Sequence, residues 1–161
     1  VIPVDCFDLV IFGATGDLAR RKILQGLYRR WKEGQIPEGS RIIGAARSDL
    51  DAGGFSTLVA EALEEFLPAA ELLPETVASF LDMLGYVTID ARGDAGWPEL
   101  GALMREGMVR AFYFSVAPAL FGDIAKRLKE RGIADRDSRI VVEKPFGRDL
   151  VSARALNRGL A

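Results

Sequence analysis

The sequence contains no histidine and only one cysteine, Cys6. Histidine is the commonest general base and a frequent metal ligand, so acid–base chemistry within these 161 residues would have to use other side chains. A single cysteine excludes an internal disulfide framework and a four-cysteine metal site, and it is typical of proteins from a reducing compartment. We therefore expect a cytoplasmic protein without a metal centre.

Long hydrophobic runs and an excess of charge of one sign are also missing. No apolar run approaches the roughly 18 residues that a membrane helix requires. The formal net charge is −2, which provides no basic field for a polyanion. Nucleic acids and membranes are therefore not expected as partners, and a small molecule is.

Strand and helix patterns alternate along the chain. Short apolar runs predict strands at residues 7–12, 41–46, 85–89, 109–115 and 139–143, and helical spacing predicts helices around 23–31, 55–66, 72–83, 97–107 and 121–131. This alternation predicts a single α/β domain over residues 1–161, with a doubly wound, mostly parallel, Rossmann-like sheet in a three-layer arrangement. Because ligands bind beyond the carboxyl ends of the strands in such sheets, the residues that follow each strand are the candidates for function.

A glycine pattern follows the first predicted strand. Gly13, Gly16 and Ala19 have the spacing of a variant dinucleotide fingerprint, in which a small residue replaces the last glycine. Gly13 would turn the chain off the strand, Gly16 would let the backbone approach phosphate, and Ala19 would let the helix pack close to the sheet. The alternative is a tight turn without a ligand, but the position after the first strand favours a dinucleotide.

The helix that begins at this turn would present its N-terminus to the ligand. Free N–H groups and the positive end of the helix dipole favour an anion there, Thr15 adds a hydroxyl donor, and Lys22 adds a charge one turn later. Asp17 would repel phosphate, so its carboxylate is expected to bond away from the ligand.

The residue after the second predicted strand indicates which dinucleotide is bound. An acidic residue there normally accepts hydrogen bonds from the ribose hydroxyls of NAD, whereas this sequence has Arg47 and Ser48. A guanidinium group matches phosphate geometry, so Arg47 favours NADP. Two alternatives stay open: Asp49 binds the ribose, or Arg47 is a solvated surface arginine.

The last predicted strand leads into Lys144 and Pro145. Lys144 would lie on the ligand-binding edge and donate hydrogen bonds to a substrate hydroxyl or phosphate, and a cis bond at Pro145 would direct it into the cleft. The alternative is a lysine that ends a strand in solvent.

Residues 13–22, 42–48 and 141–150 together resemble the glucose-6-phosphate dehydrogenase family, most specifically in the segment 143–150. The resemblance covers nearly the whole chain but only the N-terminal third of a typical member. It implies an enzyme of the pentose phosphate pathway that oxidises glucose 6-phosphate to 6-phosphogluconolactone and passes hydride to NADP.

The resemblance also implies roles for individual residues. Several residues would contact the coenzyme. The pyrophosphate would be held by Gly13, Ala14, Thr15, Gly16, Asp17 and Leu18, and the 2′-phosphate by Arg47. The adenine would lie beside Asp90 and Ala91, and other parts of the coenzyme would contact Ala117 and Pro118. Lys144 would contact both substrate and coenzyme, and Pro145 would be the family's cis proline.

The family's catalytic histidine and its β+α substrate domain, which forms the oligomer interface, would lie beyond Ala161. The missing initial Met and a helical pattern at residues 158–161 support a truncated chain that stops before the last strand of its domain. We expect this chain to bind NADP without turnover, and the full protein to be a homo-oligomer, a dimer or a tetramer. The alternatives are a Gfo/Idh/MocA-type sugar oxidoreductase, which shares a Glu-Lys-Pro after its fifth strand, and a non-catalytic NADP-sensing module.

Overall fold

A six-stranded sheet forms the centre of the computed structural model, which describes residues 5–144 and 147–152, with side chains for residues 5–142. The strands lie in the order β3-β2-β1-β4-β5-β6, and their bounds are β1 Phe7–Phe12, β2 Arg41–Ala46, β3 Leu84–Thr88, β4 Val109–Phe114, β5 Arg139–Lys144 and β6 Gly147–Ser152. The first five strands are parallel, and β6 pairs antiparallel with β5. The order places β1 at the middle of the sheet, where the connections reverse direction.

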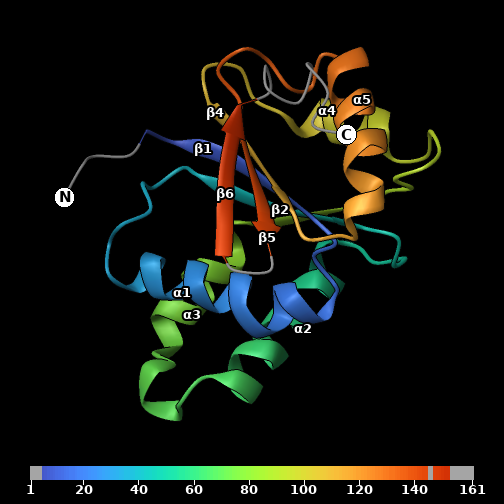
Figure 1. Cartoon of the computed structure of the whole chain (residues 1–161). Coiled ribbons are helices and arrows are strands. Elements are labelled where there is room, and N and C mark those ends of the chain that lie inside the picture. The colour runs from blue at the N-terminus through green and yellow to red at the C-terminus, as the bar shows by residue number, and fades with distance from the viewer. Residues whose placement is uncertain (1–4, 145–146, 153–161) are drawn as a thin grey trace.

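Helices cover both faces of the sheet (Figure 1). The helices α1 (Leu24–Lys32), α2 (Ala52–Phe66) and α3 (Pro74–Asp82) lie on one face, and α4 (Trp97–Leu103) and α5 (Phe121–Glu130) lie on the other. Successive residues of β1 point to opposite faces, so that Ile11 packs with the first group and Phe12 with the second. The predicted doubly wound, three-layer α/β fold is confirmed. None of the helices in the described ranges is long and apolar enough to cross a membrane.

Most element boundaries agree with the sequence patterns to within a few residues, and the differences have local causes. The helix α2 begins at Ala52 instead of residue 55, because Asp51 accepts a hydrogen bond from the N–H of Gly54 at 2.7 Å and caps it. The prediction of a helix to residue 107 is wrong: α4 ends at Leu103, and Met104 has an extended backbone. The antiparallel strand β6 was not predicted either.

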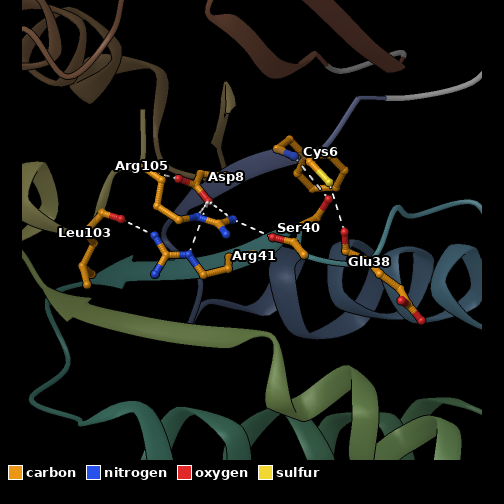
Figure 2. Close-up of polar contacts among 9 residues, drawn as sticks. Cys6, Asp8, Glu38, Ser40, Arg41, Leu103 and Arg105 are labelled. Carbon is orange, nitrogen blue, oxygen red and sulfur yellow. Dashed lines mark hydrogen bonds and ion pairs between the residues drawn. The ribbon is translucent and has the colours of Figure 1, made fainter. Parts of the chain in front are cut away.

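Because α4 ends early, Arg105 lies outside the helix and contacts a buried carboxylate (Figure 2). Asp8, in β1, is fully buried and accepts hydrogen bonds from the guanidinium of Arg105 at 2.6 and 3.0 Å and from its backbone N–H at 3.0 Å. Arg41, at the start of β2, donates from Nε at 3.3 Å and also donates to the carbonyl of Leu103. Arg105 donates further to the carbonyl of Gly39 at 2.7 Å. This network, the Asp8 cluster, joins β1, β2 and the segment after α4 at the amino edge of the sheet.

The electrostatics of the Asp8 cluster favour the ionised carboxylate. Burial alone raises the pKa of Asp8, but the hydrogen bonds from Arg105 and Arg41 and the charge of Arg41 outweigh it, so the pKa lies below its ordinary value. Because the pKa is lower in the folded chain than in the unfolded chain, the carboxylate contributes stability that is fully present above the ordinary value of 3.8. That contribution is lost as the pH falls through the lower folded-state pKa.

We predict that Asp8→Asn lowers the free energy of unfolding by about 2 kcal/mol at neutral pH, because it removes the charge from buried hydrogen bonds donated by two arginines. Urea denaturation followed by circular dichroism measures the change. The difference between the variant and the parent chain should shrink as the pH falls below 3.8 toward the lower folded-state pKa, because the unfolded parent takes up a proton at Asp8 first. Asp17→Asn is the matched control. The Asp17 carboxylate is exposed, and its ion pair with the exposed Arg21 is long, at 3.8 Å, so this substitution should have little effect on stability. An equal loss in both variants would contradict the prediction.

Candidate functional site

The carboxyl ends of four strands surround a cleft of about 240 Å³. Its walls come from the segments that follow β1, β2, β3 and β4 and from the start of the helical layer on the α5 side. These residues include Gly13, Thr15, Gly16, Arg47, Ser48, Ile89, Ala91, Ser115, Val116, Leu120 and Ile124. The edge that the topology identifies as the ligand-binding edge therefore carries a concave site.

The turn after β1 is built on a close approach between backbones. Gly13 has a φ of +82°, and a Cβ at this position would lie 2.0 Å from the carbonyl oxygen of Ser115, at the end of β4. Its N–H donates to the carbonyl of Ala45 in β2 at 2.8 Å. Only glycine fits both the φ angle and the space, so the sharp turn predicted here is present. Gly16 lies on the exposed side of the turn, where its backbone is accessible to a ligand.

The two alanines of the turn region point into the protein. The side chains of Ala14 and Ala19 are fully buried in the core on the α1 side of the sheet. Ala14 is buried as a whole residue and does not line the cleft, and Ala19 permits the close packing of helix and sheet that was predicted for it.

The chain continues from this turn as a short π-helix, Ala19–Ile23, before α1. Asp17 is exposed and lies 3.8 Å from Nε of Arg21, and Lys22 is exposed as well. Asp17, Leu18 and Lys22 do not line the cleft.

The segment after β2 brings Arg47 to the cleft. Arg47 is exposed and forms no ion pair with any other residue that the structure describes, so its guanidinium is available to an anion. The hydroxyl of Ser48 lies 3.1 Å from that of Thr15, which connects this segment to the glycine turn. Asp49 is exposed and does not line the cleft.

Two serines in the cleft were not proposed as site residues. Besides Ser48, the cleft contains Ser115, whose Oγ is buried without a hydrogen-bond partner among the described residues. An unpaired buried hydroxyl costs free energy unless a ligand or water satisfies it. In the sequence Ser115 is the last residue of a predicted strand. Its place at the carboxyl end of that strand was the one feature that could have identified it as a site residue.

Several predicted contacts are not brought into the cleft. Ala91 lines the cleft but Asp90 does not, and the Asp90 carboxylate accepts the N–H of Arg92 at 3.0 Å. Ala117 and Pro118 are exposed and do not line it. The last residue of β5 is Lys144, so its backbone is at the same edge of the sheet, but its side chain and the whole of Pro145 lie outside what the structure describes.

The described residues contain no group of three potential metal ligands from histidine, cysteine, aspartate and glutamate. Among the described residues, the site consists of backbone, hydroxyl groups, the arginine Arg47, which has no ion-pair partner there, and an apolar wall. Such a set is suited to binding phosphate groups and a flat apolar ring.

Comparison with known proteins gives a consistent result. Residues 10–161 match the family described as glucose-6-phosphate dehydrogenase, NAD binding domain. Two curated relatives are glucose-6-phosphate 1-dehydrogenases, from Rhizobium meliloti (strain 1021) with 46% identity and from Gluconobacter oxydans (strain 621H) with 44%. The alignments cover 98% of this chain in both cases, and 32% and 33% of the relatives.

Solved structures agree with the sequence matches. The crystal structure of glucose-6-phosphate 1-dehydrogenase from Mycobacterium avium has a TM-score of 0.80 and 30% identity, over 96% of this chain and 33% of that one. A glucose-6-phosphate dehydrogenase in complex with its substrate glucose-6-phosphate has a TM-score of 0.76 and 31% identity, over 100% and 35%. The chain thus spans about a third of the length of its relatives. It belongs to the glucose-6-phosphate dehydrogenase family and corresponds to that family's NAD-binding domain.

Proposed function

We propose that the cleft binds NADP and that the whole protein oxidises glucose 6-phosphate to 6-phosphogluconolactone, as an enzyme of the pentose phosphate pathway in the cytoplasm. The observation that carries the proposal is that the glycine turn after β1 and Arg47 after β2 line one cleft, where Arg47 has no ion-pair partner in the part of the chain that the structure describes. The family match over residues 10–161 favours this reaction over that of a Gfo/Idh/MocA-type oxidoreductase.

The pyrophosphate would be held at the turn after β1. The N–H groups of Gly13 and Gly16 already donate to the carbonyls of Ala45 and Gly13, so the positive end of the following helix would be the main attraction for an anion there. The absence of a side chain at Gly16 would let the anion come close. The Thr15 hydroxyl and the orphaned Ser115 hydroxyl are neutral donors within the same cleft. These residues fit a dinucleotide.

The adenosine end would be recognised at the second strand. The guanidinium of Arg47 would pair with the 2′-phosphate, which distinguishes NADP from NAD. Ala91 and Ile89 would provide an apolar surface beside the adenine. When bound, NADP supplies the hydride acceptor at its nicotinamide ring.

The sugar substrate would meet the coenzyme at the end of β5. Lys144 would donate hydrogen bonds to glucose 6-phosphate, with Pro145 fixing the direction of the segment. Because the chain has no histidine, we assign it no catalytic base and propose that the remainder of a family-length protein supplies the base, most of the sugar pocket and the contacts of a homo-oligomer.

Arg47→Ala should weaken NADP binding by about 10- to 100-fold, the range expected for hydrogen bonds to a charged group, and leave NAD binding nearly unchanged. Isothermal titration calorimetry with each coenzyme measures both. Arg30→Ala, at an exposed position of α1 away from the cleft, is the matched control and should change neither. An equal loss of NADP and NAD affinity in Arg47→Ala would contradict the assignment of Arg47 to the 2′-phosphate.

Gly13→Ala should abolish measurable binding of both coenzymes, since the added Cβ would lie 2.0 Å from the Ser115 carbonyl oxygen and force the turn apart. Gly26→Ala is the control, because no atom lies within 4 Å of its added Cβ. That variant should keep coenzyme affinity and gain about 0.5–1 kcal/mol of stability, as expected for alanine in a helix. Normal binding by a folded Gly13→Ala chain would contradict the proposed role of the turn.

The 161-residue chain should bind NADP without reducing it when glucose 6-phosphate is added. The absorbance of NADPH measures turnover, and a family enzyme of full length is the positive control. Sustained NADPH formation by the purified chain would refute the assignment of the catalytic base to another part of the protein.

A further inference from the structure

One tyrosine hydroxyl joins the two carbonyls that flank Arg47. Tyr86, in β3, donates from its hydroxyl to the carbonyl of Ser48 at 2.6 Å, and the same hydroxyl lies 3.2 Å from the carbonyl of Ala46. Thr88, two residues further along β3, donates to the Ser48 carbonyl at 3.1 Å. Arg47 thus lies between two residues, Ala46 and Ser48, whose carbonyls both contact side chains of β3.

The position of this hydroxyl is itself fixed by packing. The ring of Tyr86 lies 5.2 Å from that of Phe55, measured between centroids, and Phe55 is fully buried in α2. Phe55 in turn lies over Gly44 of β2, where a Cβ would come within 2.6 Å of its ring. Burial raises the pKa of Tyr86, with a smaller contribution from Asp49, and a phenol is in any case protonated and able to donate at neutral pH.

The same network reaches the glycine turn. Ser48 uses its carbonyl for Tyr86 and Thr88 and its hydroxyl for Thr15, 3.1 Å away. Thr15 lies where the pyrophosphate would bind, and Arg47 lies where the 2′-phosphate would bind. The two phosphate-directed groups are therefore held at a set separation by one chain of hydrogen bonds.

We propose that Tyr86 is a positioning residue for NADP selectivity, with Thr88 in support: it holds residues 46–48 so that the guanidinium of Arg47 faces the 2′-phosphate. The inference rests on the proposed function, in which the cleft binds NADP through Arg47. A loop that is already ordered loses less entropy on binding, and the gain applies only to a ligand that uses Arg47. NAD has no 2′-phosphate and does not depend on this order.

The test is Tyr86→Phe in the full chain, which keeps the ring against Phe55 and removes only the hydroxyl. Calorimetric titrations use NADP and NAD, and also adenosine 2′,5′-bisphosphate and 5′-AMP, which differ only in the 2′-phosphate. The variant should lose about five-fold in affinity for NADP and for the bisphosphate, while NAD and 5′-AMP change by less than about two-fold, as expected for one neutral hydrogen bond acting through Arg47.

Tyr28→Phe is the matched control. The Tyr28 hydroxyl also makes two hydrogen bonds, to the carbonyl of Glu71 at 2.6 Å and from the N–H of Leu73 at 3.2 Å, but it does not line the cleft. That variant should lower thermal stability without altering the ratio of NADP to NAD affinity. A merely structural role of Tyr86 would give the same pattern as Tyr28→Phe and would overturn the proposal.

Arg47→Ala measured in parallel separates the two hypotheses. If Arg47→Ala lowers the ratio of NADP to NAD affinity and Tyr86→Phe does not, the positioning role is wrong and the proposed function stands. If Arg47→Ala leaves the ratio unchanged, the assignment of the 2′-phosphate to Arg47 is wrong. Should Tyr86→Phe not fold, Thr88→Val decides, because it removes the second donor to Ser48 from an exposed position: a reduced ratio supports the proposal and an unchanged ratio overturns it.

Discussion

The contact between the backbone at Gly13 and the backbone at Ser115 determines the shape of the whole carboxyl edge. Ser115 donates its N–H to the carbonyl of Phe12 at 2.9 Å, and Gly13 donates its own to Ala45 at 2.8 Å, so the ends of β1, β2 and β4 meet within one residue of each other. A side chain at position 13 would separate them. Because the strands close up here, the turn before the following helix and the segment with Arg47 line the same cleft.

The two edges of the sheet differ in whether their charged side chains have partners. At the amino edge the Asp8 carboxylate is buried and fully occupied by Arg41 and Arg105, which makes that edge a rigid junction among distant segments. At the carboxyl edge the hydrogen bonds among Thr15, Ser48 and Tyr86 are neutral, and Arg47 is left without a counter-ion among the described residues. An anionic ligand is the group that would complete this second edge, as a carboxylate completes the first.

Whether a feature could be predicted from the sequence depends on how far apart along the chain the interacting residues lie. The strand at 7–12 and the turn at Gly13 depend on neighbouring residues, so apolar runs and glycine spacing predict them. The end of α4 depends on Arg105 meeting Asp8, 97 positions away, and no local pattern records that pairing. The contact of Tyr86 with Ser48 likewise depends on the register of β2 against β3, which local patterns do not specify. The backbone of Lys144 is at the predicted edge, and the role of this residue stays a prediction.

A neutral donor suits the position beside Arg47 better than a charged one. A carboxylate placed where the Tyr86 hydroxyl lies would compete with a phosphate for the guanidinium, and it could not donate to the Ser48 carbonyl. An ammonium group would donate, but its positive charge would oppose that of Arg47 at close range. The Tyr86 phenol is neutral at neutral pH and donates to the Ser48 carbonyl without adding a charge, so the charge of Arg47 stays available to an anion. In the proposed arrangement, selectivity for the 2′-phosphate depends on two residues, because Arg47 would supply the charge and Tyr86 would keep it in place.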